Sequence, residues 1–404
     1  MKLLFAWRYF KAKKTTQAIN IIAWISVIAI TVITASFIVL LSVFNGFEGL
    51  VKSLYSSFYA DFRVSPVSGK TLVITDSQKQ QIQAIKGIHA VSCIVEEKAL
   101  LKNGDYQTIV FVKGVDEQYS KVTGVASKMI RGTYVIGSED QPALVMGVGI
   151  EQSVAADVER GIYPLMLYVF RSGVPLSVMD PYQSFSTDRI TGAGTFLIQQ
   201  DIDQKYAITN LAFMKRMVNL PEDQYSSVEI ALTDPEMEAT VQANLSKLLG
   251  AGYKIESRYQ QNKNLYAVMR MEKWAIYGIL FLMLIVAAFT LIGSLSMLVM
   301  EKRKDIQILK ALGASHTLIQ GIFINEGFLL GGIGTFGGIL LGLLVCWIQI
   351  KFQLIGIQGG TFLINAYPVK VRFFDLLIVA STVMGVCYIA SWLPIRRAVK
   401  YDKD

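Results

Sequence analysis

The feature that most constrains this chain is a set of four long apolar runs without a charged residue, at 15–47, 274–300, 327–350 and 376–395. A helix needs roughly 20 apolar residues to cross a hydrocarbon core about 30 Å thick. Backbone polar groups must be paired within lipid, so each run is expected to be a helix. The sequence therefore predicts an α-helical membrane protein with four transmembrane helices. The first run is too long for the apolar part of a signal peptide and should remain as an anchor.

Basic residues concentrate in three segments that lie on one side of the membrane if the chain crosses it four times. They precede the first run, fill the segment between the second and third, and follow the fourth: Lys2, Arg8, Lys11, Lys13, Lys14, Lys302, Arg303, Lys304, Lys310, Arg396, Arg397, Lys400 and Lys403. The positive-inside rule assigns this side, with both termini, to the cytoplasm. The net charge of +8 then follows from topology, and it does not indicate nucleic-acid binding.

One large insert separates the first two spans. The predicted order along the chain is 1–14 amphipathic cytoplasmic segment, 15–47 first span, 48–273 domain outside the cytoplasm, 274–300 second span, 301–316 cytoplasmic connection, 317–350 third span, 351–375 loop outside the cytoplasm, 376–395 fourth span and 396–404 cytoplasmic tail. Strand and helix signals alternate at both ends of the insert, which predicts one α/β subdomain from 48–122 and 221–265. The glycine-richer part between them, 123–220, is expected to be a mainly β subdomain.

No constellation of an enzyme is visible. The two histidines, His89 and His316, fall on opposite sides of the membrane in this topology, which excludes a histidine-based metal site or catalytic triad. Gly69-Lys70-Thr71 lacks the preceding glycine of a P-loop, since Val64 stands there. We therefore expect no catalytic residue, no metal ion and no directly bound cofactor.

The third span carries small residues at spacings of three and four. They are Gly327, Gly331, Gly334, Gly338 and Gly342. Such a stripe lets helix backbones approach closely in lipid, so these residues are predicted to pack helices. Glu326, just before them, is a carboxylate within an apolar span; it is assigned to packing, with a proton or substrate relay as the alternative.

The segment 301–315, EKRKDIQILKALGAS, predicts a short amphipathic helix between the second and third spans. Acidic residues stand at its start and a glycine at its end, as expected for a helix. The residues assigned to docking on a cytoplasmic partner are Glu301, Lys302, Arg303, Lys304, Asp305, Ile306, Leu309, Lys310 and Gly313. The alternative is a solvated connector.

This segment and its continuation resemble the region after the second span in the MacB/FtsX superfamily of ABC-transporter permeases. NGFE at 45–48, YPV at 367–369, SPVSGKT at 65–71, KGVD at 113–116 and FLIQQDIDQKY at 196–206 resemble the lipoprotein-releasing, LolC/LolE-type branch. The resemblance covers essentially the whole chain. It implies a type VII ABC permease-like fold whose periplasmic domain has a porter-like α/β subdomain and a sabre-like insert.

The resemblance also implies partners and a mechanism. A LolD-like cytoplasmic ATPase dimer would use ATP and Mg and receive 301–313 as a coupling helix, beside a second permease copy or paralogue. By mechanotransmission, a lipoprotein would be extracted from the inner membrane of a Gram-negative envelope and passed to a periplasmic LolA-like chaperone. Two alternatives are a MacB-like efflux permease and an FtsX-like regulator of a cell-wall hydrolase.

The family's chaperone-docking loop matches 163–175, YPLMLYVFRSGVP. The residues assigned to it are Tyr163, Met166, Leu167, Tyr168, Phe170 and Arg171, with Phe170 standing where the family is expected to have a proline. These residues form either an exposed binding edge or a buried strand. The resemblance does not separate a LolC-like from a LolE-like role.

Overall fold

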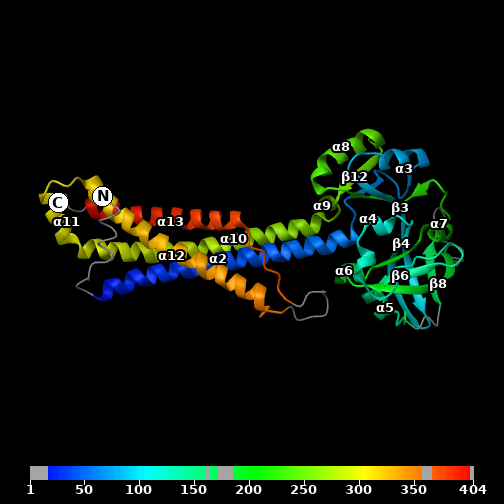
Figure 1. Cartoon of the computed structure of the whole chain (residues 1–404), viewed down its shortest axis with the longest axis horizontal. Coiled ribbons are helices and arrows are strands. Elements are labelled where there is room, and N and C mark those ends of the chain that lie inside the picture. Colours follow the sequence, from blue (N-terminus) through cyan, green and yellow to red (C-terminus); the bar gives the residue numbers. More distant parts are fainter. Residues whose placement is uncertain (1–16, 160–163, 172–184, 357–365, 401–404) are drawn as a thin grey trace, which may run out of the picture. The chain divides into compact units, whose positions relative to one another are not determined.

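The computed structural model describes residues 17–159, 164–171, 185–356 and 366–400 (Figure 1). The chain forms two compact units. The first, called the helical unit, takes Met1–Leu50, Ala267–Ile357 and Ala366–Asp404. The second, called the sheet unit, takes Val51–Tyr266. The expected amphipathic segment 1–14 lies outside the described residues.

Four long helices build the helical unit. They are α2 (Gln17–Phe58), α10 (Lys263–Glu301), α12 (His316–Phe352) and α13 (Phe373–Lys400), with the short α11 (Arg303–Ala311) between α10 and α12. Each of the four is long and apolar enough to cross a membrane, which confirms the four predicted spans. Helices α2 and α10 continue well past their charge-free runs, because α2 ends at Phe58 and α10 begins at Lys263. Their outer ends belong to the sheet unit.

The sheet unit is built on a mixed ten-stranded sheet in the described part of the chain, in the order β12-β1-β11-β3-β4-β9-β6-β8-β5, with β7 joined to both β3 and β8. The strands are β1 (Phe62–Pro66), β3 (Ile88–Asn103), β4 (Tyr106–Val115), β5 (Met129–Gly132), β6 (Ala143–Gly147), β7 (Leu165–Phe170), β8 (Phe185–Phe196), β9 (Tyr206–Asn210), β11 (Ser227–Leu232) and β12 (Tyr253–Ser257). A separate pair joins β2 (Leu72–Val73) to β10 (Gln224–Tyr225).

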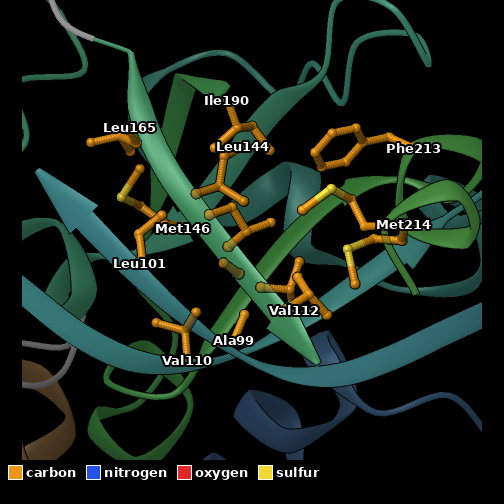
Figure 2. Close-up of a cluster of buried hydrophobic side chains, with 14 of the residues drawn as sticks. Ala99, Leu101, Val110, Val112, Leu144, Met146, Leu165, Ile190, Phe213 and Met214 are labelled. Atoms are coloured by element: carbon orange, nitrogen blue, oxygen red, sulfur yellow. The ribbon is translucent and has the colours of Figure 1, made fainter. Parts of the chain in front are cut away.

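Two hydrophobic cores share the long strand β3. The first lies under α3 (Asp76–Gln83) and α8 (Glu238–Leu249), and it includes Ile82, Cys93 and Val241. The second lies under α5 (Val148–Ser153) and α7 (Leu211–Val218), where Phe213 and Met214 meet side chains from β3, β4, β6, β7 and β8 (Figure 2). The first core contains residues from both sides of 123–220.

Local sequence explains where several of these helices begin. Thr75 and Gln78 form a capping box at the start of α3. Asn210 accepts hydrogen bonds from the backbone N–H groups of Ala212 and Phe213, which starts α7 directly after β9. The inserted part of the domain, 123–220, contains the short helices α5, α6 (Gln200–Asp203) and α7 as well as the strands β5 to β9.

Candidate functional site

The connection between α10 and α12 folds as the predicted short helix, α11. Lys302 is its N-cap residue and pairs with Asp305 one turn later, with 3.2 Å between Nζ and Oδ2. Gly313 ends the helix with φ +85°, a left-handed backbone conformation that L side chains rarely adopt. Glu301 is the last residue of α10, so the expectation that it opens the short helix is wrong.

The apolar side chains of α11 divide between two faces. Ile306 packs on the small cluster of Leu298, Val299, Ile319 and Phe323, inside the helical unit. Ile308 and Leu312 are 59% and 79% exposed. The apolar surface that α11 offers to a partner is therefore carried by Ile308 and Leu312. The sequence assignment contained Ile306 and Leu309 instead, and no pattern in the sequence distinguished the covered face of this helix from the open one.

The glycine stripe of α12 contacts two different helices. A Cβ on Gly327 or Gly331 would lie 2.0 Å from Ser391 Oγ or 2.7 Å from Cys387 Cβ, both on α13. A Cβ on Gly338 would lie 2.4 Å from Thr34 Cβ on α2. Gly334 and Gly342 face Ile30 and Ile38 of α2 in the same way. Since neighbouring backbones approach this closely, α12 is held between α13 and α2 by its small residues.

Glu326 lies next to this stripe. Its side chain is 1% exposed, so it points into the helical unit rather than toward the surroundings of the four helices. A buried carboxylate in an apolar span is costly unless protein groups surround it. Its position beside Gly327 agrees with the packing assignment.

The motifs NGFE and YPV, far apart in sequence, meet in the helical unit. A Cβ on Gly46 would lie 2.1 Å from the carbonyl oxygen of Pro368. The Asn45 side-chain amide donates a hydrogen bond to the Asp375 carboxylate, and the Lys370 N–H donates to the Ser42 carbonyl oxygen at 2.9 Å. Together these contacts hold the segment before α13 against residues 42–46 of α2.

Of the two alternatives for the assigned docking stretch, strand β7 takes the buried one over most of its length. It pairs with β3 on one side and β8 on the other, and Leu167 is 0% exposed within the second core. Met166 and Tyr168 are half-buried on the other face of the strand. Among the described residues assigned to docking, Phe170 and Arg171 are the exposed ones: the Phe170 ring lies tilted against Phe185 with 4.3 Å between ring centroids, and Arg171 Nε donates to Ser186 Oγ at 3.0 Å. Tyr163 lies outside the described residues.

Within the sheet unit, the end of α2 is braced to the chain that leads into α10. Arg258 pairs with Asp61 at 2.8 Å, and its Nε donates to the Tyr59 carbonyl oxygen at 3.0 Å. The Gln261 side-chain amide donates to the Ala60 carbonyl oxygen at 3.2 Å. Because these bonds start from α9 (Arg258–Gln261), directly before α10, the outer ends of the two long helices are held as one piece.

Residues 277–403 match the family model of the FtsX-like permease C-terminal domain. Over nearly its whole length the chain is also similar to the lipoprotein-releasing system transmembrane proteins LolC of Xylella fastidiosa, at 24% identity, and LolE of Haemophilus influenzae, at 26%. The alignment with LolC covers 97% of this chain and 95% of LolC. The alignment with LolE covers 98% of this chain and 96% of LolE. Residues 277–403 are thus similar to an FtsX-like permease C-terminal domain, and the chain as a whole is similar to LolC and LolE proteins. It is a multi-pass protein of the inner membrane.

A solved structure, the periplasmic region of MacB from Actinobacillus actinomycetemcomitans, aligns at 12% identity with a TM-score of 0.37. That alignment covers 54% of this permease and 98% of the MacB chain. The family model covers α10 from Tyr277 onward together with α11, α12 and α13, so the glycine stripe and the short helix α11 lie within the matched part.

Proposed function

We propose that this chain is a permease subunit of an ATP-driven lipoprotein-releasing ABC transporter. The observation that carries the proposal is the similarity to LolC and LolE over almost the full length, which includes the sheet unit as well as the four spans. The chain extracts lipoproteins from the inner membrane and hands them to a periplasmic LolA-like chaperone. Its two termini and α11 lie in the cytoplasm, in keeping with the basic residues around them.

The short helix α11 supports a partnership with a cytoplasmic ATPase. It lies between two spans and presents Ile308 and Leu312, flanked by Lys302, Arg303 and Lys304. Exposed apolar side chains on a short helix suit insertion into a groove of a partner protein. In this proposal the ATPase is a LolD-like dimer that binds and hydrolyses ATP with Mg, and a second permease copy or paralogue completes the membrane part.

Helices α2 and α10 supply the route by which ATP hydrolysis acts outside the cytoplasm. They have 42 and 39 residues. At 1.5 Å per residue, each is about 60 Å long, roughly twice the thickness of a hydrocarbon core. Both continue into the sheet unit, where Arg258 and Gln261 tie their outer ends together. A movement imposed at α11 is therefore transmitted as displacement of stiff helices, and no channel is needed.

The test is depletion of the chain in its host, followed by fractionation of the two membranes. Outer-membrane lipoproteins should accumulate in the inner membrane, and expression of the wild-type chain should restore their sorting. A variant with Ile308→Asp and Leu312→Asp should fail to restore it while reaching the membrane in normal amounts. Gln307→Asp, on the same helix, is the matched control and should complement.

Normal lipoprotein sorting after depletion would reject the proposal. Increased sensitivity to exported drugs would then favour the MacB-like efflux role. A defect in cell-wall cleavage would favour the FtsX-like regulator.

A further inference from the structure

A cluster of charged residues lies buried where the end of α2 meets the sheet. Lys113 of β4 and Glu229 of β11 form an ion pair with 2.8 Å between Nζ and Oε1, and both side chains are 2% exposed. Arg63 of β1 and Glu96 of β3 form a second pair at 3.4 Å. All of these residues belong to the sheet unit.

The register of the strands shows that the two pairs cross. Glu96 is the direct cross-strand partner of Lys113, and Arg63 is that of Glu229. Lys113 nevertheless pairs with Glu229 and not with Glu96. Arg63 likewise pairs with Glu96 and not with Glu229. The two ion pairs therefore link four adjacent strands, β1, β11, β3 and β4. Desolvation by burial would lower the pKa of Lys113, but the nearby carboxylates of Glu229 and Glu96 favour the charged form. The pKa is raised as a result, so Lys113 stays charged.

The end of α2 covers this cluster. The ring of Phe58, the last residue of α2, has its centroid 4.7 Å from Lys113 Nζ, and those of Tyr119 and Tyr206 are at 5.7 and 5.8 Å. The ring centroids of Phe58 and Tyr206 are 4.7 Å apart. Next to Phe58, the Ser57 carbonyl oxygen accepts a hydrogen bond from the Gly124 N–H at 2.9 Å. The rings of Phe58, Tyr119 and Tyr206 thus surround the ammonium group of Lys113. We call this arrangement the aromatic seat, because it holds the last residue of α2 against the sheet.

Replacing a buried ion pair by apolar residues of similar volume is often neutral or stabilising, since desolvation of two charges offsets their attraction. Within the described part of the chain, Glu229 Oε2 is also buried without a hydrogen-bond partner. On this general ground we expect the cluster to add little stability, while it requires each charge to stay close to its partners.

Two motifs of the sequence converge on this seat. KGVD supplies Lys113 and also Asp116, which accepts a hydrogen bond from Ser92 Oγ at 2.6 Å. FLIQQDIDQKY supplies Tyr206. These motifs have no part in α11 or in the glycine stripe.

We propose that Lys113 and Glu229 are positioning residues that fix the end of α2 on the sheet, so that a displacement of α2 is delivered to the whole sheet unit. The proposal rests on the ATP-driven function proposed above. It assigns to the buried pair the conversion of a helix movement into a domain movement.

The test uses the full-length permease, reconstituted with its ATPase and partner subunit, and the double variant Lys113→Met/Glu229→Met. Removing both charges keeps the volume and leaves no unpaired ion, so thermal stability should be unchanged or higher. ATP hydrolysis should stay near the wild-type rate. Lipoprotein release per ATP should fall by about tenfold or more. Lys254→Met/Glu256→Met is the matched control, because it removes a Lys–Glu pair of 2.6 Å from β12 of the same sheet.

A second readout does not depend on cargo. Spin labels at Asp105→Cys, in the turn between β3 and β4, and at Lys351→Cys, on α12, report the ATP-dependent change in distance between the two units. The change should be present in the wild type and in the control and be lost in the double variant. The label distance in the wild type can change with ATP even if no lipoprotein is released. In that case the proposed function is wrong, but the distance measurement still tests whether Lys113 and Glu229 transmit the movement.

Three results would overturn the inference: no ATP-dependent movement in the wild type, an equal movement in the double variant, or equal release per ATP. Should the double variant not fold, Phe58→Leu replaces it, because it removes the ring over Lys113 with a small change in volume. It should reduce the movement while leaving ATP hydrolysis in place. Unchanged movement in Phe58→Leu would again contradict the role of the seat.

Discussion

Gly46 of α2 touches the backbone of Pro368, the residue that opens the approach to α13: a Cβ on Gly46 would lie 2.1 Å from the proline carbonyl oxygen and 2.8 Å from the Val369 nitrogen. The contact explains why a glycine is needed within the NGFE motif, since the obstacle is backbone and cannot rotate away. A Cβ on Gly49, three residues later on the same helix, would meet nothing within 4 Å, so that position has no such requirement.

The first prediction compares these two glycines. Gly46→Ala should destabilise the detergent-solubilised protein by about 1–3 kcal/mol, because the added methyl group must displace the Pro368 segment. Gly49→Ala should be neutral or stabilise it by up to about 1 kcal/mol, because alanine favours a helix over glycine. Thermal unfolding of the two purified variants decides between them, and equal melting temperatures would show that the contact at Pro368 is not tight.

The second prediction concerns the glycine stripe of α12. Gly338→Ala places a methyl group 2.4 Å from Thr34 Cβ and should force α12 away from α2, whereas Gly332→Ala meets only the flexible end of Met384 at 3.9 Å. Gly338→Ala should therefore lower the thermal stability and Gly332→Ala should not. With one cysteine introduced on α2 and one on α12, the yield of disulfide crosslinking in the membrane should fall only in Gly338→Ala. An equal yield in both variants would refute the close contact.

The sequence predicted the spans and the short helix because their determinants are local: uncharged runs, basic flanks, and a glycine that ends α11. It could not predict which face of α11 is open, because Ile306 is covered by side chains from α10 and α12 that its own segment does not specify. The same reason applies to β7. An apolar strand has the same sequence pattern at a sheet edge and between two neighbours, and only long-range pairing with β3 and β8 separates the cases.

A third prediction tests the face of α11. Ile308→Asp with Leu312→Asp should reduce co-purification of the ATPase without changing the melting temperature, because both side chains are exposed. Ile306→Asp should instead destabilise the helical unit, since it brings a charge into the cluster around Leu298 and Phe323. Undiminished co-purification with the exposed-face variant would place the ATPase contact elsewhere.

A fourth prediction separates core from surface on β7. Leu167→Ala should cost about 2–5 kcal/mol of stability, as expected for a truncated side chain in a packed core. Phe170→Ala and Arg171→Glu should leave the melting temperature nearly unchanged, because they alter the open end of the strand. If the chaperone docks at this end, only the last two variants should weaken its capture by a folded permease. Loss of capture with Leu167→Ala alone would point to a different docking surface.

The last prediction follows from Asp203, which ends α6 and is buried in the sheet unit. Burial raises the pKa of its carboxyl group to about 6, although the Ile198 backbone N–H donates to it at 3.0 Å. A carboxyl group with a raised pKa holds its proton more tightly in the folded state, so its contribution to stability is greatest at acidic pH and is lost as the pH rises through about 6. Asp203→Asn keeps an oxygen for the Ile198 hydrogen bond and does not titrate. The melting temperature of the variant relative to wild type should therefore be higher at about pH 7 than at about pH 5. Asp201→Asn controls for the loss of a carboxylate from the same short helix, and a difference for Asp203→Asn that is constant with pH would contradict the raised pKa.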